Sequence, residues 1–203
     1  MKSYPDSETV LSGLGDKIVE GLSRAVVRAA RDLRHYRTTF PQWVSQASER
    51  GLANWIHDRI WWHVTALFDS MPDVEVSDRE PTREVVVGLN YRLRLKRHHE
   101  DGDLSTYPTP TALDFYLQGV QDAFPGMEEV RLAAGYEWDK ETREMGAAVL
   151  SLRDGRENIV WKVTLPEVDD GLGGVTSVPP VTGPTPPTIE TPAVDSKRVK
   201  DQE

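Results

Sequence analysis

The sequence predicts an α+β fold in which N-terminal helices are followed by a ββαβββ, mostly antiparallel sheet and by a disordered C-terminal tail. Apolar residues recur at helical spacing in the first third of the chain, apolar and polar residues alternate strictly near position 90, and the composition changes abruptly at Pro166. We therefore expect residues 1–75 to form a helical segment that packs on a sheet built from residues 76–165, with both in one domain.

Two helical stretches are expected before the sheet. In residues 7–37 apolar side chains recur every three or four positions, Ser7 can cap the N-terminus, and five arginines form a stripe along the second half. That stripe is either an ordinary solvated surface or an anion-binding one. Pro41 can open a second helix, because proline at the first helical position loses no hydrogen bond, and Gly51 is expected to interrupt it. The predicted core side of this helix consists of Ile56, Ile60, Val64, Leu67, Phe68 and Met71, widened by Trp61.

Trp55 and Trp62 lie seven residues apart in the second helix and therefore share one side of it with Arg59. An indole packed in a core buries about 150–250 Å², so the ordinary interpretation is a helix buried across the sheet. The alternative is that both indoles are partly exposed and anchor a partner, since tryptophan is enriched among the residues that dominate binding energy at interfaces.

The strand expected over residues 84–99 is the most strongly patterned part of the chain. One side of it is apolar and the other is basic, which is typical of half-buried β-structure. The turn at Asp101 and Gly102 should return the chain as a short strand over residues 104–107, and residues 71–82 are expected to form a connector. The alternating apolar residues are Leu89, Tyr91, Leu93 and Leu95.

A helix and three further strands are expected to complete the sheet. Thr109 and Pro110 should begin the helix, which then runs to Phe124 before Pro125 stops it. Alternating or continuous apolar patterns predict an antiparallel meander whose strands lie near residues 130–138, 145–152 and 159–165.

Residues 166–203 are expected to be disordered, acidic and rich in proline. They hold seven of the fourteen prolines, seven acidic residues, three basic residues and no aromatic side chain. Such a segment cannot bury enough apolar surface to offset the entropy lost on ordering.

Composition and missing motifs exclude several classes of function. The formal net charge of −9 opposes non-specific binding to nucleic acid or anionic lipid, and the lack of cysteine removes disulfides, thiolate catalysis and cysteine-ligated zinc. The sequence contains no Walker A, GxGxxG, GxSxG or HExxH motif. His57 and His63 diverge by about 120° around a helix, so they cannot share one metal ion. We expect no metal site, no cofactor and no membrane span, and a cytoplasmic location.

The remaining candidate site is the polar side of the predicted strand. Its side chains are spaced about 6.8 Å apart, so they could hold successive phosphates by charge-assisted hydrogen bonds while Tyr107 or an exposed indole stacks on a base. In a metal-independent ribonuclease, His98 would be the general base and Arg92 or Arg94 would stabilise the charged phosphate. The ordinary alternative is the solvated side of an antiparallel sheet. The candidate binding residues on this strand are Asn90, Arg92, Arg94, Lys96 and His98.

The function expected from the sequence is a small, cytoplasmic, non-enzymatic interaction or regulatory protein. Its partner is expected to be a macromolecule, foremost another protein, because catalytic motifs are missing and tryptophans cluster in the second helix. Two alternatives use the basic strand instead: a ribonuclease like those of small toxin modules, and a protein that binds RNA or DNA without cleaving it.

Overall fold

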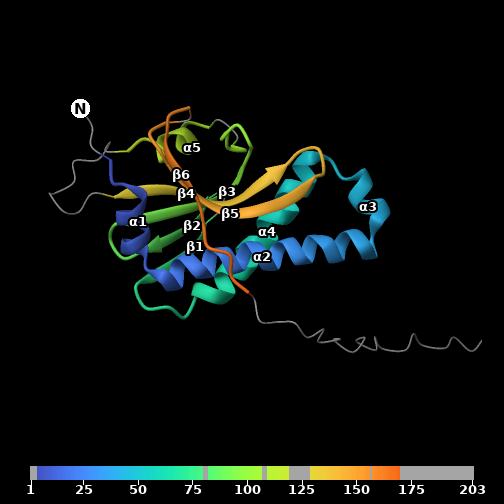
Figure 1. Cartoon of the computed structure of the whole chain (residues 1–203), viewed down its shortest axis with the longest axis horizontal. Coiled ribbons are helices and arrows are strands. Elements are labelled where there is room, and N and C mark those ends of the chain that lie inside the picture. Colours follow the sequence, from blue (N-terminus) through green and yellow to red (C-terminus); the bar gives the residue numbers. More distant parts are fainter. Residues whose placement is uncertain (1–3, 80–81, 107–108, 119–128, 156, 170–203) are drawn as a thin grey trace, which may run out of the picture. The chain divides into compact units, whose positions relative to one another are not determined.

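The computed structural model describes residues 4–79, 82–106, 109–118, 129–155 and 157–169. It confirms an α+β fold in which helices precede a six-stranded, mostly antiparallel sheet (Figure 1). The predicted tail from residue 170 onward and Tyr107 lie outside the described residues. The elements are α1 (Ser7–Leu14), α2 (Asp16–Thr39), α3 (Pro41–Gln46), α4 (Glu49–Phe68), β1 (Val74–Arg79), β2 (Thr82–Val87), β3 (Tyr91–His98), α5 (Pro110–Phe115), β4 (Val130–Asp139), β5 (Glu144–Arg153) and β6 (Ile159–Thr164).

The first predicted helix is two helices, because Gly15 adopts a φ of 81° that breaks the helical path between α1 and α2. The N-cap of α1 is Asp6 rather than Ser7, and the Asp6 carboxylate accepts a hydrogen bond from the Thr9 amide at 2.7 Å. Pro41 opens α3 as predicted. The interruption before α4 comes at Ser48, which caps that helix, and not at Gly51.

Three strands, rather than the two expected, precede α5. Gly88, with a φ of 58°, turns the chain inside the strand predicted over residues 84–99 and divides it into β2 and β3. The predicted connector over residues 71–82 contains the edge strand β1. Among its described residues, 104–106, the expected return strand is reduced to a single antiparallel bridge between Leu104 and His98, at the end of β3 that β2 does not reach. α5 ends at Phe115, well before the predicted Phe124.

The strands follow one another across the sheet in chain order, and every neighbouring pair is antiparallel except β3 and β4. A parallel pair cannot be joined by a tight turn, and the segment that links these two strands contains α5. The sequence pattern identified the strands of this pair but did not indicate their parallel direction.

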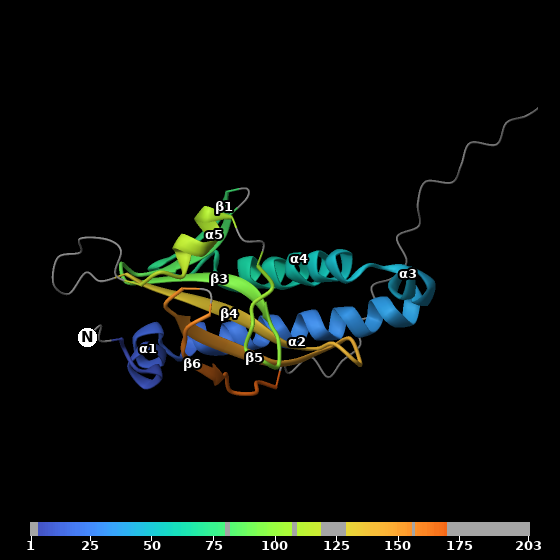
Figure 2. The same ribbon diagram turned by 90° about the horizontal axis from the view of Figure 1, so that it is seen from above.

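The main core lies between the sheet and the helices α2 and α4, which run side by side (Figure 2). α2 and α5 lie on opposite sides of the strands (Figure 1). The predicted core side of α4 is confirmed, with its members buried or packed against the core. None of the helices in the described parts of the chain is both long and apolar enough to cross a membrane. Core residues include Leu22, Ala25, Val26, Ile56, Ile60, Val64, Leu93, Leu95, Leu132 and Leu150.

A second, smaller core lies on the α5 side of the sheet and is formed by Phe115, Tyr116 and Ala133 with Leu104 beside them. Gln118 fixes the end of this segment, because its side-chain amide donates to the backbone oxygens of Arg131 and Arg153, each at 2.8 Å. The side of the sheet that was expected to be solvated is therefore partly covered. This coverage determines the surroundings of the predicted strand site.

Candidate functional site

The predicted alternation is correct within β3. Leu93 and Leu95 are buried in the main core, and the side chains of Arg92, Arg94 and Lys96 are directed to the other side of the sheet. Leu89 does not continue the apolar side, because it lies in the turn between β2 and β3 and is 80% exposed. Asn90 lies in the same turn, before β3 begins.

Two carboxylates neutralise much of the charge on this surface. Glu84 accepts hydrogen bonds from Arg94 Nε at 2.8 Å and from Arg92 Nη1 at 3.1 Å. Glu129 is hydrogen-bonded to Arg92 and accepts from Arg131 Nε at 2.7 Å. Burial alone would raise the pKa of Glu129, but the bonds from Arg131 and Arg92 outweigh it and lower that pKa. A phosphate would have to compete with both carboxylates for these arginines.

α5 covers the middle of the same surface. The guanidinium of Arg94 lies over the Phe115 ring, 3.8 Å from its centroid, and that of Arg131 lies 5.9 Å from the same ring. Burial and the nearby charge of Arg94 lower the pKa of Lys96. The strand is therefore part of an ion-paired and partly covered network. Sequence reasoning missed this network because Glu84, Glu129 and Phe115 come from three separate segments.

His98 has no exposed surface. Its Nε2 atom lies 3.0 Å from Ser151 Oγ, and burial, followed by the charge of Arg153, lowers the pKa of His98 to about 3. The imidazole is therefore neutral at pH 7, but RNA could reach it only if the covering residues moved. His99 follows the end of β3, and its Nε2 atom lies 2.8 Å from Ser105 Oγ. No sequence motif links His98 to Ser151, which is 53 residues away.

The two candidate tryptophans of α4 differ in exposure. Trp62 is 57% exposed, and the guanidinium of Arg59 lies 5.0 Å from its ring centroid. Trp55 is half-buried and stacks on Tyr36, with the ring centroids 4.7 Å apart and the planes inclined by 15°.

Aromatic side chains of α2 and α3 extend the surface that begins at these tryptophans. The ring centroids of Tyr36 and Phe40 are 5.9 Å apart. Phe40 stacks on Trp43, with the ring centroids 4.5 Å apart and the planes inclined by 7°. Phe40 is 41% exposed and Trp43 is 60% exposed. Sequence reasoning missed both, because they lie at a helix boundary where no periodic pattern identifies them. We call the set of Tyr36, Phe40, Trp43, Trp55 and Trp62 the aromatic stripe.

A charged cluster fixes α2 to α4 beside the aromatic stripe. Asp32 accepts from Arg59 Nη2 at 2.6 Å, and its carboxylate lies 2.8 Å from His63 Nε2. Burial opposes ionisation of Asp32, but the hydrogen bonds from His63 and Arg59 outweigh it, so the pKa of Asp32 is lowered. His57 Nδ1 lies 3.5 Å from Arg83 Nη1 on β2, whereas His63 faces Asp32 on α2. The predicted divergence of the two histidines around the helix is therefore confirmed. Among the described residues, no three His, Cys, Asp or Glu side chains are arranged to hold a metal ion.

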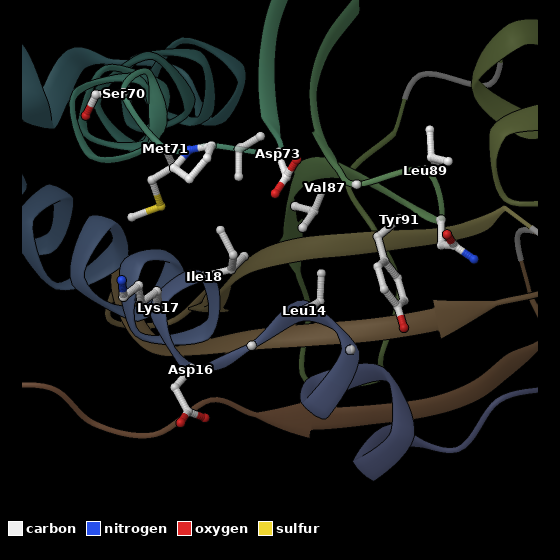
Figure 3. Close-up of a pocket in the computed structure, with 16 residues that line it drawn as sticks. Leu14, Asp16, Lys17, Ile18, Ser70, Met71, Asp73, Val87, Leu89 and Tyr91 are labelled. Atoms are coloured by element: carbon white, nitrogen blue, oxygen red, sulfur yellow. The ribbon is translucent and has the colours of Figure 1, made fainter.

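A cavity of about 760 Å³ lies where three connections between elements meet, and the predicted site residue Asn90 is among the residues that line it (Figure 3). Residues 13–18 of the α1–α2 junction, residues 70–74 between α4 and β1, and residues 87–91 around the β2–β3 turn line it. Most of the lining is apolar. No sequence pattern indicated this cavity, because its walls are short segments that are distant along the chain.

Comparisons with protein families, curated proteins and solved structures found no match to this chain.

Proposed function

We propose that this chain is a non-enzymatic interaction protein that binds a protein partner through the aromatic stripe on its helices. The observation that carries the proposal is the exposure of two indoles, Trp43 at 60% and Trp62 at 57%. A large exposed apolar patch is informative in a folded protein, and tryptophan is enriched among the residues that dominate interface energetics. An enzymatic function has less support, because the buried His98 and the ion-paired arginines of β3 offer no open catalytic site.

The rigidity of the aromatic stripe supports this role. Tyr36 lies between Trp55 and Phe40, and Phe40 in turn stacks on Trp43, so rings from α2, α3, α4 and the residue between α2 and α3 support one another. Arg59 is held by Asp32 and lies over Trp62, which limits the freedom of that indole as well. Side chains that are ordered before binding lose less conformational entropy in the complex, which favours affinity.

The charge of the helices suggests the chemistry of the partner. α2 contains six basic and three acidic residues, although the whole chain has a net charge of −9. The positive excess lies on the helix that supplies Tyr36, and an acidic partner surface would be attracted to it. We therefore propose a partner that offers apolar pockets for the indoles within an acidic surface. A cytoplasmic and regulatory setting agrees with the lack of cysteine, which leaves the fold independent of disulfides.

The test is a comparison of variants in affinity capture from the native host, followed by calorimetry with the purified partner. Trp43→Ala/Trp62→Ala should lose a stoichiometric partner, while Leu89→Ala, which truncates an even more exposed apolar residue outside the aromatic stripe, should keep it. Circular dichroism would establish that all three proteins are folded. Retention of the partner by the double variant would contradict the proposal, and so would recovery of RNA alone by the wild-type protein.

A further inference from the structure

The cavity beside α1 has the size and lining of a small-molecule site. Its volume of about 760 Å³ lies within the range of roughly 300–1,000 Å³ that is usual for ligand pockets. It is separate from the aromatic stripe, because none of the aromatic residues of that stripe lines it. A ligand here would therefore act independently of the proposed partner site.

Apolar side chains from all three lining segments form the walls. Ile18 and Leu14 come from the α1–α2 junction, Met71 from the segment before β1, and Val87 from the end of β2 (Figure 3). Val87, Leu14 and Ile18 are largely buried and belong to the main core, so this part of the cavity has rigid walls. An aliphatic chain placed against these walls would lose contact with water, and the burial of its apolar surface would favour binding.

Asp73 is the charged group directed into this space. Figure 3 shows its carboxylate between Met71 and Val87, pointing toward the cavity, whereas the Asp16 carboxylate points away from it. The backbone at Asp73 is held in place, because its backbone oxygen accepts a hydrogen bond from the Gly88 amide at 2.7 Å. No ion pair between the Asp73 side chain and another described residue is present.

Asp73 also adopts a backbone conformation that few residues tolerate. Its φ is 62°, and only Arg143 shares a positive φ among the other non-glycine residues of the described chain. Aspartate and asparagine occupy this region more readily than other non-glycine residues do. A substitution by asparagine can therefore remove the charge of Asp73 while keeping the backbone of the loop.

We propose that this cavity binds a small amphipathic cation, an aliphatic chain that ends in an amine. The chain would lie against Leu14, Ile18 and Val87, and the ammonium group would pair with Asp73. Lys17 lies at the opposite side of the cavity in Figure 3, where it would repel the cationic end and so direct it to Asp73. The negative net charge of the chain favours a cationic ligand over an anionic one.

The experiment compares octylamine, octanol and octanoate at pH 7, each below its micelle concentration, by titration of the full chain. Met71 methyl and Gly88 amide shifts in NMR spectra report on two of the three segments that line the cavity. We expect saturable shifts at both positions and binding of octylamine about three- to five-fold tighter than octanoate, because an exposed ion pair contributes at most about that much. Octanol should bind with intermediate affinity.

Two matched variants test the role of Asp73. Asp73→Asn should abolish the preference for the amine, whereas Asp16→Asn makes the same charge change on a side chain that points away and should preserve it. The proposal is overturned if neither Met71 nor Gly88 responds, if octanoate binds as tightly as octylamine, or if the preference survives in Asp73→Asn. Because none of these readouts involves Trp43 or Trp62, a failure here leaves the proposed protein-binding function untouched.

Discussion

The guanidinium carbon of Arg94 lies 3.8 Å from the centroid of the Phe115 ring, which places a cation expected to face solvent beneath helix α5. The same guanidinium is paired with Glu84. α5 is therefore joined to the sheet both by an apolar contact and by a neutralised charge. The stability of this side of the sheet should depend on Phe115.

Phe115→Ala should lower the free energy of unfolding by about 3–5 kcal/mol, as truncation of a buried phenylalanine usually does. Phe115 is almost completely buried and forms the centre of the second core. Urea unfolding followed by circular dichroism would measure the loss. Leu117→Ala, in the same segment but 36% exposed, serves as the control and should cost less than about 1 kcal/mol. Equal losses for the two variants would show that α5 does not form a core.

Stability should fall as the pH drops below about 6.5 because of His98. The pKa of His98 is about 3 in the folded protein and about 6.5 in the unfolded chain, so between these values only the unfolded chain takes up the proton. This uptake favours unfolding by up to about 1.4 kcal/mol for each pH unit below 6.5. Above pH 6.5 both states are neutral and the effect vanishes.

The measurement for His98 is the unfolding free energy at several pH values between 7.5 and about 4. His98→Gln should show a shallower decline than the wild-type protein, and His35→Gln, which replaces an exposed histidine, should match the wild type. Identical pH profiles for all three proteins would mean that His98 takes up its proton equally in both states.

Asp32→Asn should destabilise the pairing of α2 with α4 by about 1–3 kcal/mol, because Arg59 and His63 lose a charged hydrogen-bond acceptor. The matched control is Asp58→Asn, since Asp58 pairs with Arg83 but its side chain is 64% exposed. An exposed pair contributes at most about 1 kcal/mol. Thermal unfolding of both variants measures the two losses of stability. A smaller loss of stability in Asp32→Asn than in Asp58→Asn would refute the prediction.

Gly15→Ala should cost about 1–3 kcal/mol, although a methyl group there would meet no atom within 4 Å. The cost is conformational, since Gly15 has a φ of 81° and a ψ of 152°, a region that is almost restricted to glycine. Gly146→Ala, in a strand with an ordinary contact distance of 3.4 Å, should change stability by less than about 1 kcal/mol. Chemical denaturation would distinguish the two, and a neutral Gly15→Ala would mean that α1 and α2 can be joined differently.

Local patterns predicted the parts of the fold that depend on local chemistry. The alternation around Leu93, the cap at Thr109 and the proline at the start of α3 each produced the expected structure. β1 was missed because Pro72 and Asp73 precede it and suggest a turn, and the bend at Gly88 was missed because it lacks an Asn-Gly or Asp-Gly pair. The parallel pairing of β3 and β4 has no local signature at all.

The site was less predictable than the fold, because charge and exposure are set by contacts between distant residues. The sequence places Arg92 and Arg94 on one side of a strand, but only the folded chain brings Glu129 beside Arg92. Likewise, the spacing of Trp55 and Trp62 predicted a shared side of α4, and only Tyr36 on another helix decides that Trp55 is half-buried while Trp62 is not.

The parallel pairing of β3 with β4 divides the sheet into two halves, each of three consecutive antiparallel strands. Contacts within each half are local. The β3–β4 pairing, which we call the seam, joins Leu93 to Leu132 and closes a loop of about forty residues. Forming the seam therefore costs more conformational entropy than forming the contacts within either half. We expect the halves to form early and the seam late in folding. Leu132→Ala should then accelerate unfolding more than it slows refolding in stopped-flow experiments. Assembly of this domain thus resembles the docking of two small meanders, and pairing at the seam makes the two meanders fold and unfold as one cooperative unit.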